Sequence, residues 1–145
     1  MILLMAIVLI GQLYAQQQLA KDQREAQQTV IKMFDALSNR DSAGLKNYCT
    51  TDITLFEYGQ LWNTDTLIQK AIIQNQSVDF KRTNSFEFIN TTTGKTMAWV
   101  TYRLQSVMTR DGKQATVQWL ETVVLVKEKT KWKVKHLHST LIKRS

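Results

Sequence analysis

The chain has two histidines, His136 and His138, which lie two residues apart in the segment KWKVKHLHST. Side chains alternate between the two faces of a strand, so histidines at this spacing point to the same side. Trp132 and Val134 share that side, whereas Lys133 and Lys135 fall on the opposite side, where they need water. The alternation predicts that both histidines face the interior of the domain.

A metal site is one chemistry that paired histidines could serve. A catalytic zinc site needs three protein ligands, so Glu121 on the preceding strand would have to complete a His-His-Glu set. Cys49 is the only cysteine, and no cysteine–histidine cluster has the spacing of a zinc site. A hydrogen-bonded role in lining a cavity or the core is the more ordinary interpretation. The sequence therefore predicts neither a metal nor another cofactor.

Acid–base catalysis is the second chemistry open to these residues. Glu121 or a histidine could transfer a proton while Tyr58 or Tyr102 polarises a carbonyl, with burial adjusting the proton affinities. Packing is the competing interpretation for Tyr102, because this residue shares a strand face with apolar neighbours. No complete catalytic set can be identified, so the sequence leaves catalysis open. An isomerase or a lyase is the best match if the protein is an enzyme.

Charge and aromatic content argue against a nucleic-acid partner. The formal net charge of +7 comes from basic residues that are scattered and mixed with acids, which indicates a solvated basic surface. The four tryptophans fall on different predicted strands and are not interleaved with a basic groove. We expect their side chains in the core or at a subunit interface: Trp62, Trp99, Trp119 and Trp132.

The first fifteen residues, MILLMAIVLIGQLYA, carry no charge and contain a long unbroken apolar run. This run is shorter than the about 20 residues that a membrane-spanning helix needs. It matches the apolar core of a secretory signal, with Ala15 as the last residue before cleavage, and a buried N-terminal helix is the alternative. The abrupt polar stretch from Gln16 favours a signal peptide at 1–15 and a single domain at 16–145. The product would be exported, either periplasmic or secreted, without stable membrane insertion after cleavage.

Helices are predicted in the first half of this domain. Apolar residues recur at three- and four-residue intervals from Leu19 to Leu37, which predicts a long amphipathic helix ending near Asn39. Two shorter helices should follow, one over about 42–48 and one from about 63, each with a capping residue at its start.

Strand patterns dominate the rest of the chain. Two short strands pivot at Gly59, and even spacing of apolar residues from Val78 to Phe88 predicts another strand. Three long strands cover about 96–109, 114–128 and 132–142, and an Asp-Gly turn joins the first two. This order predicts an α+β domain in which helices cover one face of a strongly bent antiparallel sheet.

The strand at 114–128 has two partly apolar faces, so its alternation does not decide which face is inward. One row holds Trp119, Glu121, Val123 and Leu125, and the other holds Leu120, Thr122, Val124 and Val126. A bulge could also exchange the two faces partway along a strand.

Two segments resemble the nuclear-transport-factor-two-like superfamily, which includes SnoaL-like and ketosteroid-isomerase-like domains. LSNRDSAGLKNYCTTDITLF looks like the usual opening of the family, and ETVVLVKEKTKWKVKHLHST is similar to the end of the association domain of calcium/calmodulin-dependent kinase two. The resemblance implies a cone, in which a curved antiparallel sheet wraps around a long N-terminal helix with two shorter helices. It also implies a pocket at the wide end and homodimers formed through the outer face of the sheet.

In the kinase domain an arginine at the position of Val123 faces the pocket, so the resemblance favours the row of Trp119 as the inward one. The absence of this arginine from the present chain weakens the expectation of an acidic ligand.

The expected partners are a small molecule of unknown identity and a second copy of the chain, with binding favoured over catalysis. The alternatives are an acid–base isomerase or lyase, such as a ketosteroid isomerase, dehydratase or cyclase, and a dimerisation module with a vestigial pocket. The candidates for lining the pocket are Tyr58, Trp62, Tyr102, Trp119, Glu121, Val123, His136 and His138.

Overall fold

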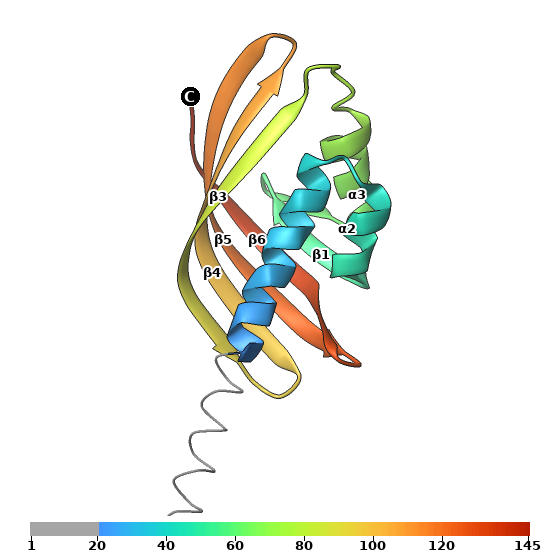
Figure 1. The fold of residues 1–145 in the computed structure, drawn as a ribbon, viewed down its shortest axis with the longest axis vertical. Helices are drawn as coiled ribbons and strands as arrows, with labels where there is room; N and C mark the ends of the chain where they lie inside the picture. Colours follow the sequence, from blue (N-terminus) through green and yellow to red (C-terminus); the bar gives the residue numbers. More distant parts are fainter. Residues whose placement is uncertain (1–20) are drawn as a thin grey trace, which may run out of the picture.

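The computed structural model describes residues 21–145, so the signal-peptide prediction for 1–15 lies outside the described residues. A long helix covers residues 21–38 and lies across the concave side of the sheet (Figure 1). Its apolar stripe is buried, with Val30 and Met33 fully inaccessible, which confirms the amphipathic pattern. None of the helices within residues 21–145 combines the length and apolarity that would let it span a bilayer.

The two short helices are also confirmed. Helix α2 (Ser42–Tyr48) begins after Asp41, whose carboxylate accepts a hydrogen bond from the Gly44 amide at 2.8 Å. Helix α3 (Thr64–Ile68) is capped in the same way by Asn63 and continues as a π-helix, η1 (Gln69–Ile73). Such caps satisfy amides at a helix start that have no partner within the helix.

Six strands form one curved sheet in the order β2-β1-β6-β5-β4-β3. Their bounds are β1 (Cys49–Glu57), β2 (Gln60–Trp62), β3 (Lys81–Thr93), β4 (Met97–Arg110), β5 (Lys113–Glu128) and β6 (Lys131–Arg144). The prediction of an antiparallel sheet is wrong for one pair of strands. Strand β1 runs parallel to β6, so the sheet is mixed. A strand pattern indicates where strands are but not which strands become neighbours, so this pairing was not accessible from the sequence.

The predicted strand beginning at Val78 starts later, at Lys81. Val78 is fully exposed in the preceding loop. Asp79 accepts hydrogen bonds from the Asp111 and Gly112 amides at 2.8 and 2.7 Å, and these amides belong to the β4–β5 hairpin. The loop and the hairpin are therefore tied together, and both lie at the wide end of the cone (Figure 1).

A bulge in β6 overturns the prediction that the histidines face inward. Val134 pairs with Leu125 on β5, but the next β5 residue pairs with His136, so the register skips Lys135. One extra residue exchanges the two faces of a strand. Val134 is accordingly inward before the bulge and Leu137 after it, whereas His136 and His138 point outward.

The inward row of β5 is the one that the resemblance favours. Trp119, Glu121 and Val123 are buried against the helices, whereas Leu120 is 43% exposed on the outer face. Trp99 on β4 is 45% exposed on that same outer face, as expected. The outer face of the sheet therefore carries large apolar side chains without cover in this single chain.

Candidate functional site

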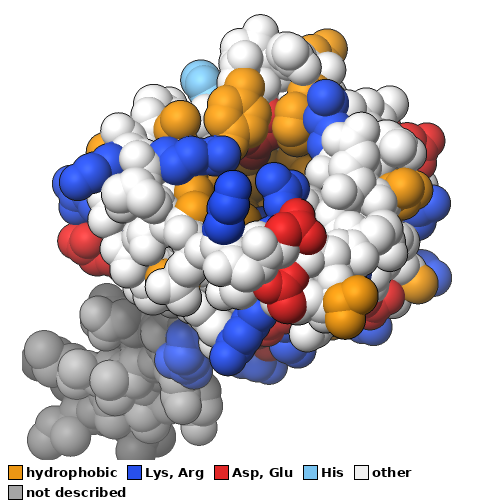
Figure 2. Space-filling model, turned by 90° about the horizontal axis from the view of Figure 1, so that it is seen from above, with side chains coloured by type: hydrophobic (Ala, Val, Ile, Leu, Met, Phe, Trp, Pro, Cys, Tyr) orange, Lys and Arg blue, Asp and Glu red, His pale blue; other side chains and the backbone are white. Residues whose placement is uncertain are grey.

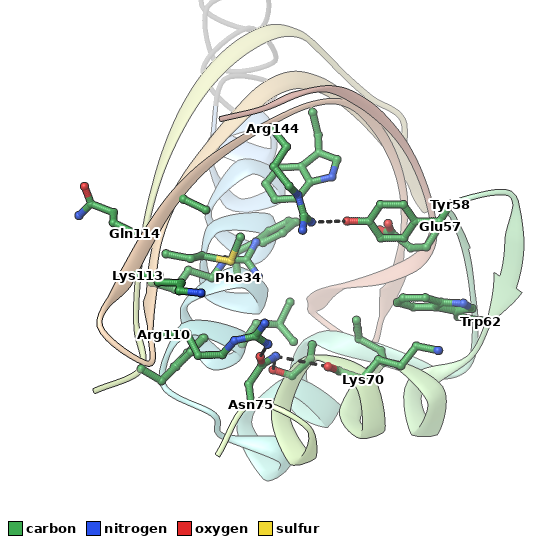
Figure 3. A pocket seen from close by; sticks show the side chains of 18 of the residues that line it. Phe34, Glu57, Tyr58, Trp62, Lys70, Asn75, Arg110, Lys113, Gln114 and Arg144 are labelled. Carbon is green, nitrogen blue, oxygen red and sulfur yellow. Dashed lines mark hydrogen bonds between the residues drawn. The ribbon is translucent and has the colours of Figure 1, made fainter. Parts of the chain in front are cut away.

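A cavity of about 610 Å³ opens at the wide end of the cone. It lies between the concave sheet and the helices, and a view into this end shows a hollow with apolar walls (Figures 2 and 3). The volume falls in the range of about 300–1,000 Å³ that small-molecule sites occupy. About half of the lining side chains are apolar or aromatic, including Phe34, Leu37, Leu67, Phe80, Met108 and Trp119.

Four of the eight candidate residues line this cavity. Tyr58 and Trp62 stand at the mouth with ring centroids 6.3 Å apart, and Figure 3 shows both on the β1–β2 side. Trp119 and Glu121 lie deeper and are almost completely buried, with 7% and 3% of their surface exposed.

The other four candidates do not line it. Tyr102 and Val123 are fully buried in the core behind the cavity wall. His136 and His138 lie outside the cone, where the ring of Phe56 contacts both, at centroid distances of 4.8 and 5.6 Å. His138 borders only a separate surface depression of about 290 Å³.

Glu121 is the most buried ionisable group of the cavity. Its Oε1 accepts a hydrogen bond from Ser139 at 2.8 Å, whereas no described residue hydrogen-bonds to its Oε2. Burial raises the pKa of Glu121, and Tyr102, Ser139 and Arg82 oppose this shift. The bulge at Lys135 is what turns Ser139 inward to meet this carboxyl group.

Tyr102 lies directly opposite Glu121 in the β4–β5 register. Its ring packs edge-on against Phe34, Phe86 and Phe88, which supports the packing interpretation of this residue. Its hydroxyl lies close to the carboxyl group of Glu121, but no well-aligned hydrogen bond joins them. Burial, and then the charge of Glu121, raise the pKa of Tyr102 well above its ordinary value.

Glu57 is a cavity residue that the sequence argument missed. It ends β1 and lines both the cone and the depression beside His138. Burial raises its pKa to about 7, the charge of Glu121 adds to the shift, and Ser139 and Arg82 oppose it. The alternation of Ile53, Leu55 and Glu57 was the signal that could have found it.

Arg82 was also missed, although it shares an alternating face of β3 with Phe86 and Phe88. Its guanidinium lies over the rings of Phe34 and Trp119, 5.4 and 5.8 Å from their centroids. It donates hydrogen bonds to Asn84 and Ser106, at 2.9 and 3.2 Å. These contacts hold one positive charge beside the two glutamates.

Four exposed basic residues surround the mouth, and we call them the basic rim. Lys70 comes from η1, Arg110 and Lys113 from the β4–β5 hairpin, and Arg144 from the end of β6. Figure 3 shows their side chains around the opening, and Figure 2 shows basic side chains on several sides of the hollow, with acidic side chains beside some of them. Arg110, Lys113 and Arg144 lie at strand ends, where alternation gives no prediction, and Lys70 lies on a helix.

A three-ligand metal site does not form in the described part of the chain. Among residues 21–145, no group of three or more histidine, cysteine, aspartate or glutamate side chains could hold a metal ion. The reason is the bulge, which places His136 and His138 on the face opposite to Glu121.

The sequence profile of the SnoaL-like domain family matches residues 26–142. No curated protein matches the chain significantly.

Solved structures share the fold. A conserved protein from Planctomyces limnophilus has a TM-score of 0.76 at 13% identity, covering 85% of this chain and 99% of that one. A protein from Novosphingobium aromaticivorans described as a scytalone dehydratase scores 0.71 at 12% identity, covering 87% of each chain. The hub homology domain of the calmodulin-dependent kinase from Chlamydomonas reinhardtii scores 0.67 at 21% identity, covering 83% and 98%. Identities this low show a common fold and nothing finer.

Proposed function

The chain belongs to the SnoaL-like domain family, and we propose that it binds a small organic molecule in the cavity at the wide end of its cone. The observation that carries this proposal is an open cavity of about 610 Å³ with apolar walls and a polar cluster at its base. Small-molecule sites have this composition, because apolar walls supply affinity and a few polar groups fix the orientation.

The base of the cavity supports the same proposal. A buried oxygen without a well-aligned hydrogen bond is costly, and Glu121 Oε2 is one, although the Tyr102 hydroxyl lies near this carboxyl group. A ligand hydroxyl or other donor that reached this oxygen would supply the missing bond. A cone filled by side chains would have favoured a vestigial pocket, and the open cavity favours binding instead.

Acid–base catalysis is the second candidate function, and Glu57 is the observation that favours it. A general acid or base works best when its pKa is close to the working pH, and burial raises the pKa of Glu57 to about 7. Ser139 lies between the two carboxyl groups, because it donates to Glu121 and also lowers the pKa of Glu57. An isomerase or lyase reaction on a carbonyl compound suits this pair.

Two further proposals concern the setting of the domain. Homodimers formed through the outer face of the sheet would cover Trp99 and Leu120, and the structural relatives include hub domains.

Export is supported by the uncharged apolar composition of residues 1–15. Mass spectrometry of the protein from its native cells should give an N-terminus near Gln16, and an intact Met1 on a cytoplasmic product would refute export.

Binding in the cone can be tested with N-phenyl-1-naphthylamine, an uncharged dye that fluoresces in apolar sites. Ala71 lines the cavity from η1, and Ile73, two residues on, is half exposed and does not line it. The wild type and Ile73→Trp should bind the dye, whereas Ala71→Trp should lose binding because the indole fills the cavity. Absence of binding to the wild type, or equal binding by both variants, would refute the proposal.

A further inference from the structure

The basic rim brings together four cations that are far apart in the sequence. Lys70 lies on the helical side of the mouth, and Arg110 and Lys113 lie on the opposite hairpin (Figure 3). Arg144 enters from the last strand and donates to the Tyr58 hydroxyl at 3.4 Å. The fold therefore brings these four basic residues together at the mouth of the cavity.

Among the lining residues, Asp111 is the one carboxylate on the hairpin side of the mouth, against the four cations of the rim. Within residues 21–145, no carboxylate oxygen lies within 4 Å of the side-chain nitrogens of Lys70, Lys113 or Arg144. Arg110 has a carboxylate contact only with its exposed neighbour Asp111, at 3.9 Å. Its guanidinium is also held by Asn75 Oδ1 at 2.9 Å, and both residues line the cavity.

The base of the cavity carries mainly acidic groups, whereas the mouth carries mainly basic ones. Two carboxyl groups, Glu57 and Glu121, lie there with a single cation, Arg82. Each of the two carboxyl groups is held in a buried setting that disfavours its charged form. The burial that disfavours these charged forms also disfavours a ligand anion at the base, whereas an anion at the mouth would be attracted.

Building on the proposed binding function, we propose that the ligand is an amphipathic organic anion held with its acidic group at the basic rim. Its apolar body lies between the walls that include Phe34 and Trp119, and its inner end approaches Glu121. The position of Val123, where the kinase domain has an arginine, is buried and apolar here, so an acidic group has no cation to meet there. The rim is where this chain offers positive charge instead.

Two dyes with the same ring system distinguish the contribution of the ligand's negative charge from that of its apolar body. 8-Anilinonaphthalene-1-sulfonate carries a sulfonate that N-phenyl-1-naphthylamine lacks. In the double variant Arg110→Gln/Lys113→Gln, the Kd of the sulfonate dye should rise by about 5-fold or more at low salt, because two partly screened attractions are lost. The Kd of the uncharged dye should change by less than about 2-fold, because the apolar walls are untouched.

The matched control removes two charges from the other end of the molecule. Lys95 and Lys129 are exposed on the turns at the narrow end of the cone (Figure 1). The variant Lys95→Gln/Lys129→Gln has the same net charge as the rim variant and should bind the sulfonate dye like the wild type. Ala71→Trp should abolish binding of both dyes, which places them in the cone.

The outcomes distinguish this inference from the proposed function. If the uncharged dye fails to bind the wild type, the proposed function itself fails. If that dye binds in the cone but the rim variant leaves the sulfonate dye unaffected, only the ligand class is refuted. Equal losses in the rim and control variants, or sulfonate binding that survives Ala71→Trp, would also refute the role of the rim.

Discussion

Tyr102 and Glu121 lie opposite each other on β4 and β5, and their buried polar groups lie close together without a well-aligned hydrogen bond. Burial raises the pKa of both groups, so the protein favours their neutral forms. This pair of uncompensated polar groups lies where the core meets the base of the cavity, and Glu121 is the member that lines it.

The Tyr102 hydroxyl is expected to contribute little to stability. Tyr102→Phe should change the free energy of unfolding in urea by less than about 1 kcal/mol, because the hydroxyl makes no well-aligned hydrogen bond. Tyr102→Leu should cost about 2 kcal/mol or more, because it removes a ring from contact with Phe34, Phe86 and Phe88. A loss in Tyr102→Phe as large as that in Tyr102→Leu would mean that the hydroxyl is bonded.

Glu57 should make stability depend on pH. Its pKa is raised to about 7 in the folded protein, so the folded state binds a proton more tightly than the unfolded chain does. The charged group therefore lowers stability increasingly as the pH rises from about 4.5 to 7, and the penalty is complete above that window.

Glu57→Gln removes this penalty. In urea denaturation it should raise the free energy of unfolding by about 1–3 kcal/mol at about pH 8, and change it little at about pH 4. Glu128→Gln, an exposed site at the end of β5, should show no such difference. A destabilised Glu57→Gln variant at the higher pH, or the same effect at both pH values, would contradict the buried setting.

The outer face of the sheet should mediate dimerisation. Light scattering of the domain at micromolar concentration should give twice the monomer mass, and Trp99→Lys/Leu120→Lys should give the monomer mass with an unchanged circular dichroism spectrum. Burying two lysines against apolar surface is unfavourable, which is why this variant separates the subunits. Ile73→Lys, on an exposed helical site, is the control that should remain dimeric. A monomeric wild type would refute the dimer.

Much of the fold could be predicted because its signals are local. The helical stripe around Val30 and Met33, a capping residue at the start of each short helix, and the Asp-Gly turn depend on neighbouring residues and were all confirmed. The parallel pairing of β1 with β6 depends on contacts between distant segments, so no local pattern reveals it.

The site was predicted less completely, for two physical reasons. The skipped residue Lys135 carries no sequence signal of its own, yet it reverses the faces of His136 and His138 and brings Ser139 to Glu121. Three of the four basic-rim residues lie at strand ends, where side-chain direction follows from the turn geometry and not from periodicity. Glu57 and Arg82, by contrast, lie on regular inward rows and could have been found by alternation.

The four tryptophans allow the most direct test of the central claim, because their indole N–H signals are separate probes of different places. Trp62 and Trp119 line the cavity, Trp99 lies on the outer face, and Trp132 is buried but lines only a different depression. In ¹H–¹⁵N spectra recorded while N-phenyl-1-naphthylamine is added, the signals of Trp62 and Trp119 should shift and those of Trp99 and Trp132 should stay in place. Shifts confined to Trp99, or no shift at all, would contradict binding in the cone.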